Sequence, residues 1–223
     1  MDLEQFNKYF SKGNYTGALK YCLNAADQGD VQAQCTLGFM YCYDEWKEHD
    51  FSEAKKWYQK AAEQGNIPAQ FNLGVMYDNG DGIAQDYAEA RKWYQKAAEQ
   101  DRADAQYNLG CMYAFGEGVM QDYAEAKKWF QKAADQGDAN SQYNLGLMYD
   151  KGYGVEKDFV QARKWYQKAA KQGHAVAQYK LGLIYYMGYG GVSEDSNKAR
   201  KWLQEAAKQG FDLAQHMLAT VID

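Results

Sequence analysis

One dipeptide recurs at a constant interval along this chain. Leucine-glycine occurs five times, each 36 residues after the last, at Leu37-Gly38, Leu73-Gly74, Leu109-Gly110, Leu145-Gly146 and Leu181-Gly182. Tryptophan follows at nearly the same interval, at Trp57, Trp93, Trp129, Trp165 and, one residue late, Trp202. A fixed period of this length is typical of an array of stacked units that each contain two elements. A residue found in every unit therefore builds the unit, and a residue that varies on one face can distinguish partners.

Residues 67–102 show how the first half of one unit folds. A helix is predicted from about Pro68 to Asn79, because its apolar residues share one face. These residues are Ala69, Leu73, Met76 and Tyr77. Gly74 lies in the middle of this helix, where glycine costs about 1 kcal/mol relative to alanine. Its recurrence in all five units predicts that the partner helix approaches closely at this point and leaves no room for a side chain.

The second half of the unit begins with a turn. Gly80-Asp81-Gly82 is predicted to end the first helix, because glycine adopts the left-handed conformation without strain. A second helix is predicted to start at Asp86 with a capping box. In this box Asp86 accepts hydrogen bonds from first-turn N–H groups, and Glu89 reaches back to the aspartate. The same pattern occurs at Asp50/Glu53, Asp122/Glu125 and, with glutamine, Asp158/Gln161.

The period predicts a single repeat domain over residues 1–223. It consists of a degenerate starter unit (1–30), five full units (31–66, 67–102, 103–138, 139–174 and 175–211) and a closing helix (212–223). Terminal units of a stack are expected to be atypical, since each has only one neighbour to cover it. No linker and no second domain are expected.

Composition excludes several classes of protein. The net charge of −5 argues against nucleic-acid binding, which needs a basic stripe. No segment approaches the roughly 20 apolar residues of a membrane span. The first residues lack the charged-then-apolar layout of a signal peptide. We therefore expect a cytoplasmic monomer, with a periplasmic or secreted location as the alternative if a leader has been removed.

The unit 103–138 carries a family pattern. It has Ala105, Leu109-Gly110, Tyr113, Gly116-Glu117-Gly118-Val119, Asp122-Tyr123, Ala126, Trp129-Phe130, Ala133-Ala134 and Gln136-Gly137. This pattern resembles the Sel-one-like repeat (SLR) family, a relative of tetratricopeptide repeats, and the resemblance covers nearly the whole chain. It departs from the family at residues 42–49, which lack the glycine loop, and at Gly190-Gly191, which adds one residue.

The resemblance implies an all-α, right-handed superhelical solenoid of antiparallel helix pairs. The first helices of the pairs would line its concave side and the second helices its convex side. It also implies a non-catalytic adaptor or scaffold that binds a partner protein or an extended peptide, often in bacterial signalling, envelope or host-interaction systems. An immunity or inhibitor-type protein that caps a toxin or an enzyme is the alternative within the binding class.

Catalytic and metal chemistry have little support in the residues. The glycine turns are not expected to bind phosphate or calcium, because a helix precedes each turn and the chelating positions fall on Gly80 and Gly82. The trio Cys35, Cys42 and His49 matches no common metal spacing. No catalytic residue, metal or cofactor is therefore expected, and a hydrolase or metal-binding protein is the alternative of another class. Free thiols are expected, with a bridge between Cys22 and Cys35 left open.

The residues that vary on the first helices are the candidate partner-binding site. Aromatic residues lie two positions before most of the repeated leucines, and asparagine lies directly before three of them. A row of asparagines can hydrogen-bond to the backbone of a bound peptide. The predicted site is Phe39, Tyr43, Phe71, Asn72, Val75, Tyr107, Asn108, Cys111, Phe115, Tyr143, Asn144, Leu147, Tyr179, Lys180, Leu183 and Tyr186. The alternative is that the aromatic residues pack between adjacent first helices and the asparagines form only local hydrogen bonds. Trp46, which breaks the repeat pattern, is either an exposed anchor for a partner or a side chain that packs over the first unit.

Overall fold

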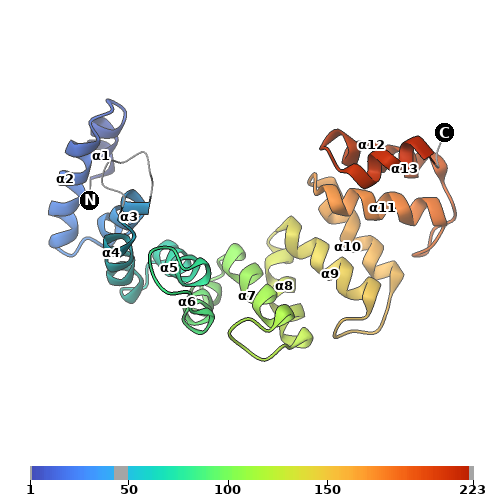
Figure 1. Ribbon diagram of the computed structural model, residues 1–223, viewed down its shortest axis with the longest axis horizontal. Coiled ribbons are helices and arrows are strands. Elements are labelled where there is room, and N and C mark those ends of the chain that lie inside the picture. Colours follow the sequence, from blue (N-terminus) through green and yellow to red (C-terminus); the bar gives the residue numbers. More distant parts are fainter. Residues whose placement is uncertain (1, 43–49, 221–223) are drawn as a thin grey trace. The chain divides into compact units, whose positions relative to one another are not determined.

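All regular secondary structure in the part of the chain that the structure describes is helical. The structure, a computed structural model, describes residues 2–42 and 50–220, which form thirteen α-helices and no strand (Figure 1). The helices are α1 (Leu3–Phe10), α2 (Tyr15–Asp27), α3 (Val31–Cys42), α4 (Phe51–Glu63), α5 (Ile67–Asn79), α6 (Tyr87–Glu99), α7 (Ala103–Phe115), α8 (Tyr123–Asp135), α9 (Ala139–Lys151), α10 (Phe159–Lys171), α11 (Ala175–Met187), α12 (Ser196–Lys208) and α13 (Asp212–Thr220). The predicted all-α class is confirmed.

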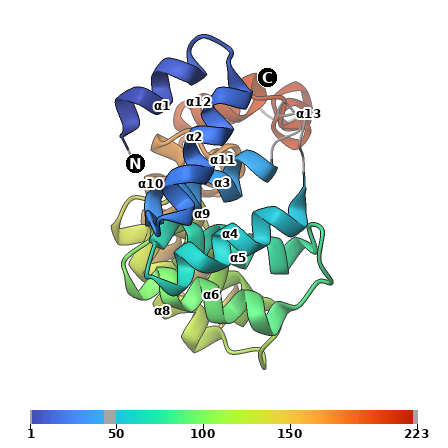
Figure 2. The ribbon, with the colours of Figure 1, turned by 90° about the vertical axis from the view of Figure 1, so that its left-hand side faces the viewer.

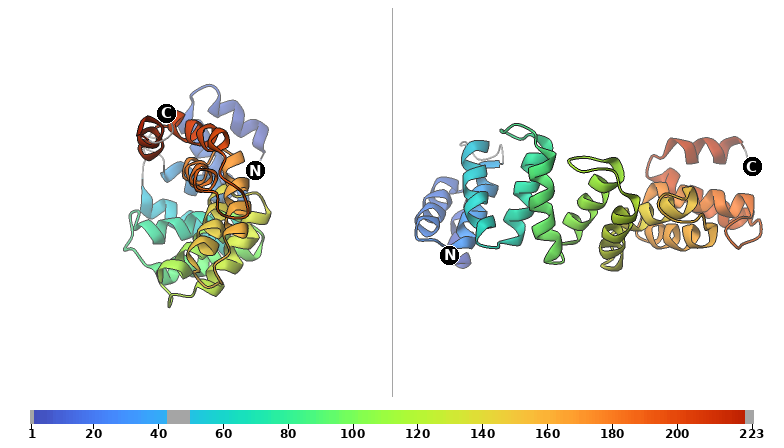
Figure 3. Two further views of the ribbon diagram at one scale, coloured as in Figure 1. Left: turned by 90° about the vertical axis from the view of Figure 1, so that its right-hand side faces the viewer. Right: turned by 90° about the horizontal axis from the view of Figure 1, so that it is seen from below.

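The contacts divide the chain into two compact units. The first comprises residues 1–105 with 117–119, and the second comprises residues 106–116 with 120–223. In the first unit, each helix from α1 to α5 contacts the next helix along the chain (Figure 2). In the second unit, α8 to α12 do the same (Figure 3). Within each unit, these helices are thus held by their neighbours in sequence, as in other repeat arrays.

The glycine of each Leu-Gly pair faces a side chain of the second helix. A Cβ added to Gly74 would lie 2.6 Å from Cδ1 of Tyr94, closer than real Cβ contacts. The same contact forms between Gly38 and Tyr58, Gly110 and Phe130, Gly146 and Tyr166, and Gly182 and Leu203. The predicted close approach is confirmed. It is a buried side chain that fills the space over the glycine, and this burial offsets the helix cost of glycine.

The turns between the two helices of a pair also have the predicted geometry. Gly80 caps α5 in the left-handed conformation, with φ of 79°. The second glycine of a turn packs on the second helix of the preceding repeat: a Cβ at Gly154 would lie 2.6 Å from Cβ of Tyr123. The glycine turns are therefore helix-to-helix connections that also join successive repeats.

One of the two predicted hydrogen-bonding features of the capping box is present. The Asp86 carboxylate accepts hydrogen bonds from the backbone N–H groups of Ala88 and Glu89, both at 3.0 Å, as predicted. The N–H of Asp86, however, donates to the carbonyl oxygen of Tyr77 at 2.8 Å, and Glu89 pairs with Lys92 instead. The predicted return bond from glutamate is therefore wrong. The turn brings Asp86 back to the last turn of α5, whose carbonyl groups lack helical donors.

A buried glutamine in the first helices was not predicted. Nε2 of Gln70 donates to the carbonyl oxygen of Ala62 at 3.1 Å, and Oε1 of Gln70 accepts from Nε2 of Gln100 at 2.8 Å. The same side-chain pair forms between Gln34 and Gln64, Gln106 and Gln136, Gln142 and Gln172, and Gln178 and Gln209. Each glutamine thus links the ends of helices that would otherwise leave carbonyl groups without donors.

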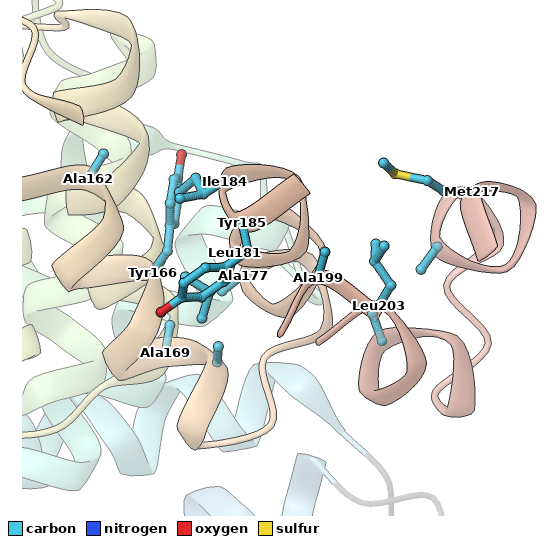
Figure 4. Close-up of a cluster of buried hydrophobic side chains, with 13 residues drawn as sticks. Ala162, Tyr166, Ala169, Ala177, Leu181, Ile184, Tyr185, Ala199, Leu203 and Met217 are labelled. Atoms are coloured by element: carbon cyan, nitrogen blue, oxygen red, sulfur yellow. The ribbon is translucent and has the colours of Figure 1, made fainter. Parts of the chain in front are cut away.

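Apolar side chains from successive helices form continuous clusters. Figure 4 shows one in the second unit, where Tyr166 of α10 and Leu203 of α12 meet Leu181 and Ile184 of α11. Met217 of α13 closes this cluster and is 9% exposed. The clusters hold the first helices in place. Several predicted site residues, among them Tyr107, Cys111 and Leu183, pack against the edges of these clusters.

Candidate protein-interaction face of the first helices

The predicted site residues share one flank of each first helix. On α7 they recur every fourth residue, at Tyr107, Cys111 and Phe115, so that they lie one above another. The corresponding pair on α9 is Tyr143 and Leu147. We call this flank, with its counterparts on α3, α5 and α11, the first-helix face. It lies beside the buried stripe of leucine, glycine and methionine.

In the first unit, the face includes one exposed aromatic ring. Phe39 of α3 is 44% exposed, whereas Phe71, Asn72 and Val75 of α5 are half-buried. Tyr43 and Trp46 lie outside the described residues.

In the second unit, exposure is greatest at the C-terminal ends of the helices. Phe115 of α7 is 71% exposed, and Met187 of α11, next to the predicted Tyr186, is 57% exposed. The other predicted residues of this unit are half-buried: Tyr107, Asn108, Cys111, Tyr143, Asn144, Leu147, Tyr179, Lys180, Leu183 and Tyr186. The face therefore combines half-buried side chains with exposed apolar groups at one end.

The aromatic rings two positions before the leucines lean on the second helix of their own repeat. The ring centroids of Phe71 and Tyr94 are 5.7 Å apart, and those of Tyr143 and Tyr166 are 5.8 Å apart. The rings are tilted, as aromatic pairs commonly are. Each of these rings is therefore fixed from one side by its own repeat.

The residue that precedes the next first helix fixes the same rings from another side. The guanidinium of Arg102 lies 4.2 Å from the centre of the Phe71 ring. The imidazole of His174 stacks on Tyr143 at 4.7 Å. These contacts were not predicted. The signal was present, because this position also varies between repeats: it holds Asp30, Asn66, Arg102, Asp138, His174 and Phe211.

The asparagines have partners within the protein. Nδ2 of Asn72 donates to the hydroxyl oxygen of Tyr58 in the preceding repeat at 3.1 Å. Asn144 is hydrogen-bonded to the Tyr107 hydroxyl. These bonds are of the local kind that the alternative interpretation expects. An amide has two donor hydrogens and two acceptor lone pairs, so one such bond leaves capacity for a ligand. The peptide-gripping role of the asparagines stays a prediction.

Acidic groups near the face are structural. The hydroxyl of Tyr94 donates to Oδ2 of Asp78 at 3.0 Å, and burial raises the pKa of the Asp78 carboxyl. In the following repeat both groups are replaced: Phe130 takes the place of the tyrosine and Ala114 that of the aspartate. In the preceding repeat Tyr58 is paired with Cys42 instead. These carboxylates therefore pair with tyrosine hydroxyl groups inside the fold.

None of the four cysteines forms a disulfide. Burial raises the pKa of Cys35 and of Cys42 to about 11, which disfavours the nucleophilic thiolate form of both at neutral pH. Within residues 2–42 and 50–220, no three histidine, cysteine or acidic side chains gather as metal ligands would; His49 is outside these ranges. In the same part of the chain, no helix has the length and apolar character that crossing a membrane requires.

Helix pairs that interlock through a glycine and a large side chain, and that repeat every 36 residues, define an α-helical repeat protein. The Sel1 repeat profile matches residues 9–30, 31–66, 67–101, 103–138, 139–174 and 175–211. The chain belongs to the Sel1 repeat family, as its sequence pattern predicts. Proteins of this family generally mediate protein–protein interactions, and the repeat is typically a non-catalytic scaffold.

Solved structures agree with this assignment. The chain is similar to c5321, a protective antigen of uropathogenic Escherichia coli with an SLR fold, at 36% identity and a TM-score of 0.87 over 96% of this chain. It spans 50% of the length of that protein. A Sel1 repeat protein from Oxalobacter formigenes is 36% identical with a TM-score of 0.83, covering 94% of this chain and 83% of that one.

A more distant structure shows the fold alone. The immunity protein Pa5087 from Pseudomonas aeruginosa is 20% identical with a TM-score of 0.51, covering 89% of this chain and 75% of that one. No curated protein sequence matches the chain.

Proposed function

We propose that this protein is a non-catalytic scaffold that binds a partner protein through the first-helix face. The observation that carries the proposal is the exposure of apolar side chains at variable positions of a regular repeat. Phe39 is 44% exposed and Phe115 is 71% exposed. Large apolar groups that a monomer leaves in water are typical of interaction sites, and burying them contributes most of the binding free energy.

The residues of the face have distinct roles in this proposal. Val75, Leu147 and Leu183, which lie two positions after the repeated leucines, supply apolar contact area beside the exposed phenylalanines. The aromatic rings before the leucines, such as Tyr143 between Tyr166 and His174, are already held on two sides. Such rings lose little conformational freedom when a partner binds, which favours affinity.

The composition of these helices indicates what the partner presents. Of the sixteen predicted residues of the first-helix face, Lys180 alone is charged. A face with so few charges selects for apolar side chains with a hydrogen-bonding backbone. We therefore infer that the partner presents an apolar protein surface or an extended apolar segment.

Photo-cross-linking tests the proposal, because it captures a bound protein of any identity. A benzophenone amino acid replaces Phe115 in the protein expressed in its source cells, and adducts are identified by mass spectrometry after ultraviolet exposure. The matched control places the same group at Lys128, which is exposed on α8, the second helix of the same repeat. We expect a specific adduct at position 115 that is absent at position 128. Adducts at position 128 alone would show that the partner binds the other face.

A further inference from the structure

The outer surface of the second helices changes its charge along the chain. On α4, α6 and α8, the third and last positions are acidic: Glu53 and Glu63, Glu89 and Glu99, Glu125 and Asp135. On α10 the same positions hold Gln161 and Lys171. Together with Arg163, Lys164 and Lys168, this helix has four basic residues and no acidic one.

The acidic residues of the other second helices neutralise their lysines. Lys56 pairs with Glu53 at 3.0 Å, Lys92 pairs with Glu89, and Lys128 pairs with Glu125. Lys164 occupies the same place on α10, but the residue three positions before it is Gln161. In the described part of the chain, no carboxylate lies within ion-pair distance of Lys164, Lys168 or Lys171. The lysine site is thus retained and its carboxylate is missing.

These three lysines form an ordered stripe. They are exposed and follow one another at intervals of four and three residues, which places them on one face of α10. Nζ of Lys168 lies 3.8 Å from the centre of the Trp165 ring, a cation–π contact that holds the side chain along the helix. A cation that is already oriented loses less conformational freedom when it binds an anion.

The neighbouring second helix extends the basic surface. Both α10 and α12 contact α11 within the second unit. Lys201 of α12 is exposed at the position that corresponds to Lys164, and Lys208 corresponds to Lys171. Glu205 binds Lys208 at 2.7 Å, so the α12 stripe is partly neutralised. The stripe on α10 is therefore the strongest cationic feature of this surface.

We propose that the outer face of α10 is a docking surface for an acidic segment of a partner protein. The carboxylates of that segment take the places that Glu89 and Glu99 hold on α6. This site is on the second helix of its pair and does not depend on the first-helix face.

Two observations favour protein carboxylates over other anions. The repeats themselves show which group this lysine binds, since its counterparts on α4, α6 and α8 all pair with glutamate. The net charge of the whole chain is −5, which opposes its approach to an extended anionic polymer or membrane. A short acidic segment contacts α10 alone and avoids that repulsion.

Fluorescence anisotropy with the full chain and a fluorescein-labelled oligoglutamate peptide tests this proposal. We expect binding at about 50 mM salt that weakens at about 300 mM, because exposed ion pairs are screened. The double variant K164Q/K168Q should weaken binding about tenfold, since each exposed pair contributes modestly. The matched control K128Q/K132Q removes the same two positions from α8, including a lysine stacked on Trp129 at 4.5 Å, and should change affinity less than twofold.

A second variant tests the same proposal while keeping Lys164 and Lys168. Q161E/K171E gives α10 the acidic positions of α6, and it should abolish peptide binding while circular dichroism shows unchanged helix content. Absence of peptide binding to the unaltered protein, or an equal loss in the α8 control, would overturn the proposal. Tighter, α10-dependent binding to phosphatidylserine vesicles than to the peptide would also overturn it, in favour of a lipid surface.

Discussion

At the scale of single residues, the repeat is specified by matched pairs across the two helices of a unit. Gly146 and Tyr166 are one such pair, with a Cβ at the glycine only 2.5 Å from the ring. Tyr94 and Asp78 are another, in which the hydroxyl and the carboxylate are both absent from the repeat that carries Phe130 and Ala114. In the glycine pairs the glycine is constant and the large side chain that fills the space over it varies, from Tyr166 to Phe130 or Leu203.

The first prediction concerns the glycine. Gly146→Ala is expected to lower the free energy of unfolding by about 1–3 kcal/mol, because the added methyl group forces the buried Tyr166 ring to move. Guanidinium unfolding followed by circular dichroism measures the loss. In a Tyr166→Ala background the same substitution should cost clearly less. An equal cost in both backgrounds would mean that the glycine is not required by the ring.

The second prediction concerns the tyrosine–aspartate pair. Tyr94→Phe is expected to destabilise the protein by about 1–3 kcal/mol, since it leaves the partly buried Asp78 without its donor. The double variant Tyr94→Phe, Asp78→Ala reproduces the natural pair Phe130 and Ala114. It should recover most of the loss in chemical denaturation. If the double variant is less stable than the single variant Tyr94→Phe, the pairing of these positions is coincidental.

Some residue contacts could be predicted from the sequence and others could not. The glycine repeated inside each first helix predicted close contact with the second helix, because few other causes explain a glycine in the middle of a helix. The predicted acceptor for the Asp86 N–H, the Glu89 carboxylate, was wrong. The turn returns the chain to α5, so that this N–H donates to the carbonyl oxygen of Tyr77 instead. The role of Gln70 was missed because its two partners come from different helices, and neither is near it in sequence.

At the scale of helices, successive repeats contact each other at the start of each first helix. There, the residue before the helix packs against an aromatic ring of the preceding repeat. His174 opens α11: its Nδ1 accepts a hydrogen bond from the N–H of Ala177 at 3.2 Å, and its ring stacks on Tyr143. Asn66 and Asp138 cap α5 and α9 from the same position. The capping group can change while its position is kept, because only an acceptor is needed there.

The third prediction follows from this histidine. Burial lowers the pKa of His174 from 6.5, although the nearby Asp138 opposes the shift, and only the neutral ring can accept the bond from Ala177. A lowered pKa in the folded state means that the stabilisation is present above about pH 6.5 and is lost as the pH falls through the folded value.

The variant His174→Asn keeps an acceptor that does not titrate. As the pH falls from about 8 to below the folded-state pKa of His174, the wild-type protein should lose up to about 1 kcal/mol of unfolding free energy relative to this variant, the usual contribution of an N-cap. Urea unfolding at a series of pH values measures the difference. Parallel losses in the two proteins would show that the cap does not titrate.

At the scale of the whole molecule, the 36-residue period predicted the helix pairs and their order because, within each unit, helices are stabilised by their neighbours in sequence. The binding site was harder to predict. Whether Tyr143 faces a partner or a neighbouring repeat depends on His174, and whether Asn72 is available depends on Tyr58. These contacts join different repeats, so a pattern read within one repeat does not contain them.

The fourth prediction concerns the array as a unit. Removal of residues 1–30 takes away Ala18, Cys22 and Ala26, which cover Leu37 and Met40 of α3. A stack held by neighbouring contacts loses stability at the altered end and keeps the rest of its fold. The shortened protein should remain helical by circular dichroism, with a lower midpoint of unfolding. Complete loss of helix would show that the chain folds as one indivisible core.

The central claim is that the first-helix face binds the partner, and calorimetry with the partner captured by cross-linking tests it most directly. Phe115→Ala combined with Leu147→Ala removes apolar contacts from the face. Lys92→Gln combined with Lys128→Gln changes the outer surface to a similar extent. The first variant should weaken binding by about 2 kcal/mol or more, in the range of hot-spot residues, and the second should leave the affinity unchanged within about 0.5 kcal/mol. Loss of affinity in the lysine variant with full binding by the first would contradict the account.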